Sequence, residues 1–327
     1  MNPLPRVCLS LLLLVLSLFR VEVSQAGPPL KELLTGGRVV FIGDSITYSG
    51  QYIEYLEAAL RLEDPKAKID FLDLGLPSET LSGLSEPGHA GGQFPRPDVH
   101  ERLTRLLDKT QPKVLILCYG MNDGIYHPFS EERFGKFKTG IQDVRKEAES
   151  RRIQVVHITP PVFDPLPLQG RLLPAGLSEY RTPYAGYNEV LDRYSDWLVS
   201  QRLSGWHVID IHGPMNRHLE QQRMKSLDYR LASDGVHINE TGHWLIAQEF
   251  LRSVNLGALA ENADPKAAFA TLPKGAAVLE LVQKRQRLLK DSWLTHVGHV
   301  RPGMATGKPL AEAGKEAADL DAKIRSL

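Results

Sequence analysis

The chain has 327 residues, of which 42% are hydrophobic and 24% are charged, and this composition excludes an intrinsically disordered protein. Its formal net charge is zero, so there is no electrostatic basis for nucleic acid as a partner. The length is enough for one large domain or two small ones.

Residues 1–26 are predicted to be a cleaved secretory signal peptide. Arg6 supplies a positively charged start, residues 7–19 are apolar, and a small-x-small cleavage site ends at Ala26. The apolar stretch is shorter than the roughly 20 residues that a membrane span needs. We therefore expect a secreted or periplasmic protein that is not stably inserted in a membrane, with an uncleaved anchor as the alternative.

Cleavage of this segment would remove Cys8 and leave Cys118 as the single cysteine of the mature chain. One cysteine cannot form an internal disulfide, so stability must come from the hydrophobic core. Because Cys118 lies in an apolar run, we expect it to be a buried core thiol.

The first predicted strand is an apolar run at residues 39–43 that leads into Gly43-Asp44-Ser45. Both faces of the run are apolar and it is too short for a helix, so it is expected to be a strand buried inside a parallel sheet. Gly43 permits a sharp strand-to-helix junction. Ser45 would then lie at the carboxyl end of the strand, the edge of an open α/β sheet where ligands bind.

Strands and helices alternate after this run. Further strands are predicted at Lys68–Leu74, Val114–Cys118, Val155–Thr159 and Val208–Ile211. Helices are predicted at Gln51–Leu62, Asp98–Asp108, Glu131–Arg151, Tyr184–Leu203, Pro214–Leu227 and Glu240–Val254, with Asp98 and Asn239 as N-caps. Such alternation predicts an α/β fold with a parallel sheet covered by helices on both faces.

Three other segments lack this alternation. Residues 27–37 are interpreted as a linker, and Leu84–Pro97 as a long ordered loop rich in Gly and Pro. Residues 160–183 form an insertion that is also rich in Gly and Pro. Loops this long in compact domains are usually functional or disordered.

Residues 27–255 are predicted to be one domain, and residues 256–327 a helical extension. Its helices are expected at Ala276–Leu294 and Leu310–Leu327. His296 and His299 have no acidic or cysteine companion, which favours a structural role over metal binding. The amphipathic pattern of the extension suggests that it mediates assembly or covers an active site, and both possibilities stay open.

Four segments fall at related positions of the predicted sheet. Ser45, Gly75 and residues 120–123 follow the first three strands, and residues 234–237 precede the last helix of the domain. Carboxyl ends of neighbouring parallel strands share one edge, so these distant segments can form one pocket. Each segment alone has a plain structural interpretation as a turn or a helix start, but their joint occurrence favours a site.

The residue types at these positions suit ester cleavage. Ser45 can be the nucleophile and His237 the general base, with Asp234 to orient the imidazole. The N–H groups of Ser45 and Gly75 and the side chain of Asn122 could form an oxyanion hole.

These motifs resemble those of the SGNH hydrolases, also called the GDSL esterase/lipase superfamily. In the family's order, the similar blocks are Gly43-Asp44-Ser45, Gly75, Gly120-x-Asn122-Asp123 and Asp234-x-x-His237. The resemblance covers roughly residues 38–254 and implies a flavodoxin-like α/β/α sandwich with a five-stranded parallel sheet. It also implies a triad without metal or cofactor, made of Ser45, Asp234 and His237, and oxyanion donors from Ser45, Gly75 and Asn122.

Two departures from the family pattern are visible. The first block continues with Ile46 instead of Leu, and the second reads Gly75-Leu76-Pro77 where many members have an Asn beside the glycine. The chain looks most like bacterial exported members, which often act on acetylated carbohydrate. The resemblance therefore implies a secreted serine esterase that hydrolyses small acyl esters of a small molecule or a polysaccharide.

Alternatives to this function remain. A lipase or thioesterase would have a longer acyl pocket, and a non-catalytic carbohydrate-binding relative would share only the fold. Aromatic residues near the insertion could stack on sugar rings or be ordinary core and loop residues: Phe163, Tyr180, Tyr184, Tyr187 and Trp206. The oligomeric state stays open.

Overall fold

The computed structural model describes residues 28–327, so the predicted signal peptide and Cys8 lie outside the described residues. A five-stranded, all-parallel sheet has the strand order β2-β1-β3-β4-β5. The strands are β1 (Gly36–Gly43), β2 (Lys68–Asp73), β3 (Val114–Cys118), β4 (Gln154–Ile158) and β5 (His207–Ile209). In this flavodoxin-like order the chain changes direction across the sheet between β1 and β3, where open α/β sheets bind ligands.

The two central strands have the most continuous apolar sequence. Residues 39–42 of β1 and all of β3 are at most 2% exposed. Burial on both faces is what a central strand of a covered parallel sheet requires, and it explains why the predicted strands lie close to the observed ones. The largest difference is at β1, which begins three residues earlier than predicted, at Gly36. Cys118, at the end of β3, is a buried free thiol as expected.

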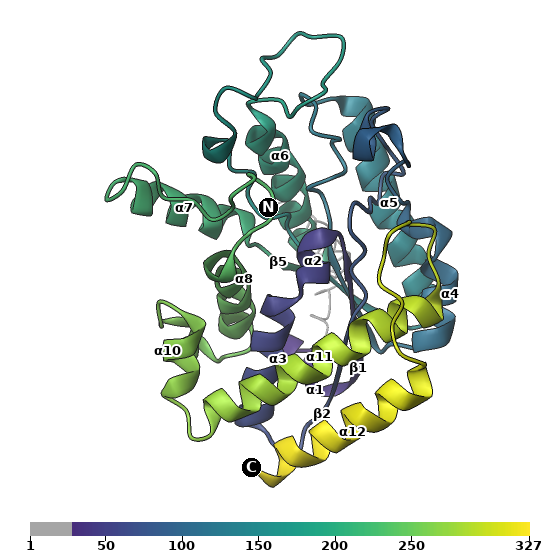
Figure 1. The fold of residues 1–327 in the computed structure, drawn as a ribbon, viewed down its shortest axis with the longest axis vertical. Coiled ribbons are helices and arrows are strands. Elements are labelled where there is room, and N and C mark those ends of the chain that lie inside the picture. Colours follow the sequence, from purple (N-terminus) through teal and green to yellow (C-terminus); the bar gives the residue numbers. More distant parts are fainter. Residues whose placement is uncertain (1–27) are drawn as a thin grey trace, which may run out of the picture.

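Helices cover both faces of the sheet (Figure 1). On one face lie α3 (Gln51–Glu63) and α8 (Glu240–Ser253), and on the other lie α4 (Leu103–Thr110), α5 (Glu131–Ser150) and α6 (Tyr187–Ser200). Aromatic pairs join neighbouring helices: Tyr52 stacks on Phe250 between α3 and α8, and Phe137 stacks on Tyr194 between α5 and α6. Helix α7 (His212–Arg223) projects from the body of the molecule (Figure 1).

Two short helices differ from the sequence prediction. The expected linker contains α1 (Leu30–Thr35), whose Leu33 and Leu34 are buried, and α2 (Ser45–Ser49) follows β1 directly. Asp98 caps a short 3₁₀ turn rather than the helix itself, because α4 begins only at Leu103. Helices α1 and α2 and this 3₁₀ turn are too short to leave a periodic signal in the sequence, and tertiary packing holds them in place.

Beyond residue 255 the chain is helical, as predicted. The helices are α9 (Gly257–Ala260), α10 (Pro265–Ala270), α11 (Gly275–Val297) and α12 (Leu310–Ser326). Helix α11 packs along α3 and the β2 edge of the sheet, and α12 packs on α11 (Figure 1). The buried Arg285 of α11 forms ion pairs with Glu57 of α3 and Asp70 of β2, so the extension is attached through buried charges.

Candidate active site

Ser45 stands at the carboxyl end of β1, where the strand passes directly into α2. The junction is tight, because a Cβ atom at Gly43 would lie 2.6 Å from the carbonyl oxygen of Cys118 on β3. Close approach, not a left-handed φ, is therefore what requires this glycine. Asp44 caps α2 by accepting a hydrogen bond from the Ile46 N–H at 2.9 Å, and Ser45 stays half-exposed.

His237 and Asp234 meet Ser45 although 192 residues separate the serine from the histidine. His237 Nε2 lies 2.8 Å from Ser45 Oγ, and His237 Nδ1 lies 2.6 Å from Asp234 Oδ2. The other oxygen of Asp234 accepts the N–H groups of Val236 at 3.0 Å and His237 at 2.8 Å. The structure thus brings together all three predicted triad residues in one chain of hydrogen bonds.

The environment keeps Asp234 ionised. Partial burial raises the pKa of this carboxyl, but hydrogen bonds from the His237 ring and from the N–H groups of His237 and Val236 lower it, and the net shift is downward. The Asp234 and His237 side chains are 51% and 56% exposed. A carboxylate held next to an accessible imidazole fixes the imidazole tautomer and stabilises its protonated form.

The loop that carries this pair is held from two sides. Gly235 has φ +79°, and a Cβ atom there would lie 2.5 Å from the carbonyl oxygen of Asp164, whose N–H donates to the Gly235 carbonyl at 2.9 Å. Arg223 of α7 binds both carboxylate oxygens of Asp164 at 2.7 Å. On the other side, Asn239 caps α8 through the Gly242 N–H, as predicted.

Asn122 lies in the segment after β3, four residues beyond the end of the strand, on the same sheet edge as Ser45. Its Nδ2 donates to the carbonyl of Glu79 at 3.3 Å, and its Oδ1 accepts from the Tyr126 hydroxyl at 3.1 Å. These bonds orient the amide and leave a second Nδ2 hydrogen to donate. Asp123, buried beside it, ties this motif to the loop after β2 by accepting the N–H groups of Leu81 and Ser82.

Gly75 also lies in this region, but its N–H is engaged. It donates to Asp73 Oδ1 at 2.9 Å, and a Cβ atom on Gly75 would lie 2.3 Å from the backbone nitrogen of Tyr48 in α2. This close approach is a sufficient structural reason for the glycine. Its predicted role as an oxyanion donor remains a prediction, because the N–H would have to leave Asp73 or be shared with it.

The next residues form a tight turn that sequence reasoning missed. The Glu79 N–H donates to the Leu76 carbonyl at 3.1 Å, Pro77 is the second residue of the turn, and Ser78 is left-handed with φ 72°. This is the pattern of a type II β-turn, which normally has Gly or Asn in the place of Ser78. Within residues 28–327, the Ser78 N–H has no hydrogen-bond acceptor. Proline was the one local signal for this turn.

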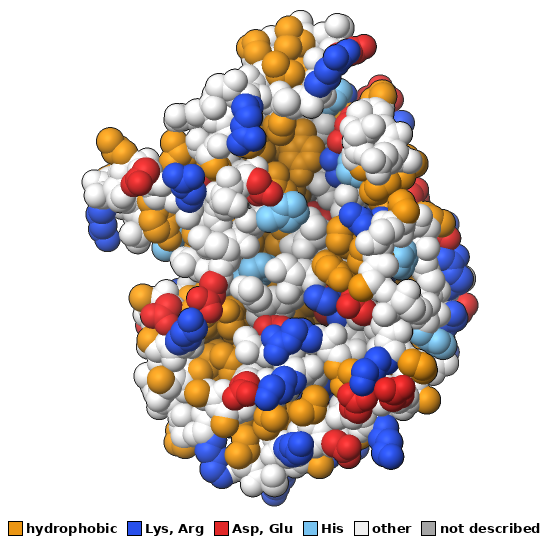
Figure 2. Space-filling model, viewed as in Figure 1, with side chains coloured by type: hydrophobic (Ala, Val, Ile, Leu, Met, Phe, Trp, Pro, Cys, Tyr) orange, Lys and Arg blue, Asp and Glu red, His pale blue; other side chains and the backbone are white. Residues whose placement is uncertain are grey.

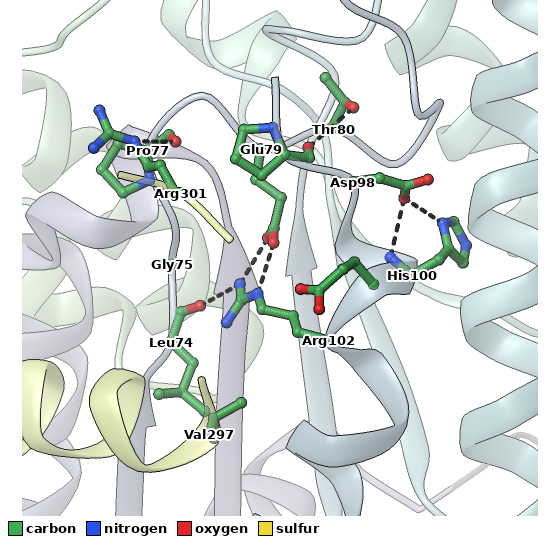
Figure 3. A network of polar contacts seen from close by, with 12 residues as sticks. Leu74, Gly75, Pro77, Glu79, Thr80, Asp98, His100, Arg102, Val297 and Arg301 are labelled. Atoms are coloured by element: carbon green, nitrogen blue, oxygen red, sulfur yellow. Dashed lines mark hydrogen bonds and ion pairs between the residues drawn. The ribbon is translucent and has the colours of Figure 1, made fainter. Parts of the chain in front are cut away.

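A buried ion pair supports the turn from below (Figure 3). Arg102 donates from Nε and Nη2 to the two carboxylate oxygens of Glu79 at 2.6 Å each, and also to the Leu74 carbonyl at 2.8 Å. The Tyr119 hydroxyl donates to the same carboxylate at 2.5 Å. Arg102 and Glu79 are at most 1% exposed. These bonds use Nε and Nη2 of Arg102, while its buried Nη1 has no hydrogen-bond partner among the described residues. A buried pair with this many hydrogen bonds fixes the backbone that it contacts.

A cleft of about 840 Å³ lies near Asn122, although neither Asn122 nor a triad residue is part of its lining. Tyr126, which binds Asn122, lies on its wall, and Arg96 stacks over the Tyr126 ring while pairing with Glu86 through two bonds of 2.7 Å. Figure 2 shows the hollow between surface loops, with hydrophobic side chains on its floor. Its lining mixes aromatic, glycine and charged residues: Glu86, Pro87, Gly88, Gly91, Gly92, Ile125, Tyr126, His127, Ser178, Glu179, Tyr180, Arg181, Thr182 and Pro183.

Of the five aromatic residues considered for sugar stacking, Tyr180 lines this cleft. Phe163 and Tyr187 are core residues, at most 1% exposed, and Trp206 packs against His157 away from the cleft. Tyr184 is half-buried beside Tyr180. The predicted 160–183 insertion thus contributes residues 178–183 to the wall of the cleft.

Other features bear on the chemistry. Within residues 28–327, no three His, Cys, Asp or Glu side chains are grouped so that they could hold a metal ion. The His296 ring packs against Trp293, and the His296 carbonyl accepts a hydrogen bond from Lys109. In the described part of the chain, no helix is long and apolar enough to cross a membrane.

Residues 41–245 match the GDSL-like lipase/acylhydrolase family. The comparison with curated proteins gives no match.

Solved structures with a similar fold include two enzymes. One is a gut microbial diltiazem-metabolizing enzyme, with 20% identity, a TM-score of 0.50, and coverage of 67% of this chain and 46% of that one. This chain therefore spans less than half of that enzyme. The other is Axe2, an acetylxylan esterase from Geobacillus stearothermophilus, whose catalytic mutant has 18% identity, a TM-score of 0.50, and coverage of 67% of this chain and 94% of that one. Identities this low establish the fold alone.

Proposed function

The chain belongs to the GDSL-like lipase/acylhydrolase family and is a carboxylic ester hydrolase, and we propose that it is a secreted serine esterase that removes small acyl groups, acetyl above all, from carbohydrate. The observation that carries the proposal is the continuous chain Asp234–His237–Ser45, with contacts of 2.6 and 2.8 Å. This is the arrangement in which a base can take the proton of a nucleophile while a carboxylate orients the base.

The proposed reaction has two halves. His237 Nε2 takes the Ser45 proton as Oγ attacks the ester carbonyl, and the resulting oxyanion is stabilised by the Ser45 N–H and Asn122 Nδ2. The imidazolium then protonates the leaving alcohol, which departs and leaves Ser45 acylated. A water molecule, deprotonated by His237, attacks the acyl group, and collapse of the second intermediate returns the proton to Ser45 and releases the acid.

The cleft reaches the proposed site through Tyr126, whose hydroxyl donates to Asn122, and its lining supports a polar alcohol part for the ester. Glu86, Glu179 and Arg181 on its lining are poor partners for a long alkyl chain, whereas Tyr180 and Tyr126 offer aromatic surface and hydroxyl groups. Its volume lies within the roughly 300–1,000 Å³ of small-molecule sites. The acetylxylan esterase Axe2 shares the fold, which agrees with the proposal without establishing the substrate.

The test is hydrolysis of a panel of p-nitrophenyl esters from acetate to laurate, together with acetylated xylan, by wild type and Ser45→Ala. We expect the highest kcat/KM on acetyl substrates and its loss by more than about 10³-fold in Ser45→Ala. A preference for laurate would keep the mechanism and make the enzyme a lipase or thioesterase. No Ser45-dependent hydrolysis at all would leave a relative that binds carbohydrate without cleaving it.

Export and domain organisation are part of the proposal. Residues 1–26 have the pattern of a signal peptide, residues 27–255 would be the hydrolase domain, and residues 256–327 its helical extension. N-terminal sequencing of the protein recovered from a bacterial periplasm or culture medium should give a chain that begins at Gly27. A retained Met1 would contradict cleavage.

A further inference from the structure

The C-terminal extension reaches back to the turn after β2 (Figure 3). Arg301, in the loop between α11 and α12, donates from Nε to the carbonyl of Pro77 at 2.8 Å, across 224 residues of sequence. Its Nη1 donates to the Pro302 carbonyl at 2.9 Å and contacts Met304 Sδ at 3.3 Å, and its guanidinium lies 5.4 Å above the Phe94 ring. No carboxylate of residues 28–327 forms an ion pair with Arg301. Its charge is therefore directed at a backbone carbonyl.

That carbonyl belongs to the central peptide of the type II turn. In a trans peptide the C=O and N–H point in opposite directions, and no cis peptide occurs in the described residues. A donor that holds the Pro77 carbonyl on one side therefore directs the Ser78 N–H to the other side. Types I and II turns differ by a flip of this same peptide, so the orientation of the N–H depends on which turn is adopted.

Ser78 by itself disfavours the observed turn. A residue with a Cβ atom is strained at φ 72°, and a flip to a type I turn would let Ser78 return to negative φ. The flip would break the bond between Arg301 and the Pro77 carbonyl and reverse the Ser78 N–H. The bond from the extension thus opposes the local preference of the turn.

Hydrogen bonds place this peptide next to the proposed active site. On one side, the Leu76 N–H donates to the Gly43 carbonyl at 2.8 Å, two residues before Ser45. On the other, Asn122 Nδ2 donates to the Glu79 carbonyl at 3.3 Å. The free Ser78 N–H therefore lies on the segment that joins the nucleophile junction to Asn122.

We propose that Arg301 is a positioning residue that holds the Pro77–Ser78 peptide so that the Ser78 N–H completes the oxyanion hole. The engaged N–H of Gly75, which donates to Asp73, then leaves Ser78 as the donor from this segment. The inference rests on the proposed function and deepens it, because it gives the extension a part in the same site. In this proposal, the Arg301 guanidinium keeps Ser78 in the left-handed conformation that glycine normally adopts.

The test combines Arg301→Ala with Ser78→Gly and measures kcat and KM on p-nitrophenyl acetate. Loss of one oxyanion donor typically lowers kcat by about 10²–10³, so we expect Arg301→Ala to lose about 10²-fold in kcat with little change in KM. Glycine adopts the type II turn without strain. The double variant Arg301→Ala/Ser78→Gly should therefore have a kcat at least about tenfold higher than that of Arg301→Ala. Arg301→Lys, which can still donate to the carbonyl, should retain most activity.

Two controls separate this inference from instability and from failure of the proposed function. Lys284→Ala removes an exposed cation of α11 that pairs with Glu280, and it should leave kcat unchanged. Melting temperatures of all variants report any loss of folding. Wild-type kcat in Arg301→Ala, or a double variant no more active than Arg301→Ala, overturns the inference while Ser45-dependent hydrolysis stands. Absence of Ser45-dependent hydrolysis in the wild type overturns the proposed function, and this inference with it.

Discussion

At the residue scale, Asp234 uses its two carboxylate oxygens for different tasks. Oδ1 accepts the N–H groups of Val236 and His237, and Oδ2 faces His237 Nδ1. In Asp234→Asn, the amide oxygen can keep the backbone bonds only if the NH₂ group faces Nδ1. Two donors then oppose each other, so the imidazole proton moves to Nε2 and faces Ser45 Oγ, where it prevents proton transfer from the serine.

We therefore expect Asp234→Asn to lower kcat by up to about 10⁴-fold on p-nitrophenyl acetate, with the melting temperature unchanged. Asp228→Asn is the matched control, because this exposed carboxylate bonds only to the nearby Ser226 hydroxyl within the described residues. Its kcat should equal that of the wild type. An Asp234→Asn enzyme within tenfold of wild type would show that the carboxylate does not set the tautomer.

Asp73 gives the protein a pH-dependent stability. Burial raises the pKa of this carboxyl to about 7, although Lys290 and the Gly75 N–H act in the opposite direction. In the unfolded chain its pKa is near 3.8, so between about pH 4 and 7 the folded protein holds a proton that the unfolded chain has lost. Because the folded state binds more protons, the contribution of Asp73 is greatest at acidic pH and is lost as the pH rises through 7.

Asp73→Asn removes this titration while keeping an acceptor for the Gly75 N–H. The stability of the variant relative to wild type should therefore increase from pH 5 to pH 8. Urea unfolding at the two pH values measures the difference. The same relative stability at both would mean that Asp73 ionises in the folded protein as it does in the unfolded chain.

The positions of some site residues could be predicted from the sequence, and those of others could not. Asp234 and His237 share one loop, and Ser45 follows a strand that is apolar on both faces, so their placement follows from local pattern and sheet topology. The engagement of the Gly75 N–H depends on how Asp73 turns back, and the contact of Arg301 with the turn joins segments 224 residues apart. Neither leaves a periodic or compositional signal.

At the scale of elements, helix ends depend on backbone conformation more than on composition. Helix α5 ends at Ser150, and Arg152, two residues later, is left-handed with φ 62°. Its N–H donates to the Glu149 carbonyl at 2.9 Å, and its side chain makes no hydrogen bond within residues 28–327. A left-handed residue with a Cβ atom costs about 1 kcal/mol that glycine would avoid.

Arg152→Gly should therefore be more stable than Arg152→Ala by about 1 kcal/mol, because both lose the same side chain and only glycine removes the strain. The free energy of unfolding in urea provides the measurement. Equal stability of the two variants would show that the position carries no strain. The result matters for prediction, since the end of a long periodic helix is predictable from sequence while a strained residue after it is not.

At the scale of the whole molecule, the extension and the sheet share a buried network of charges. Arg285 of α11 is 4% exposed and lies 3.3 Å from Glu57, 3.0 Å from Asp70 and 3.1 Å from Asp321. It also donates to the Phe71 carbonyl on β2 at 3.2 Å. The helical character of residues 256–327 could be predicted from composition, but this attachment joins residues more than 200 positions apart and could not.

Arg285→Ala would leave Glu57, which is fully buried, with one fewer cation and would loosen α11 from β2. Removing one partner of a buried ion pair costs about 3–5 kcal/mol, so the free energy of unfolding should fall by that amount. Lys284→Ala, one residue earlier, removes a cation from an exposed pair and should cost less than about 1 kcal/mol. Equal effects of the two variants would show that the buried network does not anchor the extension.

The same unfolding curves test the proposed division at residue 255. Because Arg285 joins α11 to β2 and α3, loss of this contact should lower the stability of the whole sheet. A single transition in wild type and in Arg285→Ala, followed by far-UV circular dichroism and by tryptophan fluorescence, would mean that residues 256–327 unfold together with the hydrolase domain. Two separate transitions would make the extension an independent unit. The bond between Arg301 and the turn at Ser78 could then break while the hydrolase domain stays folded.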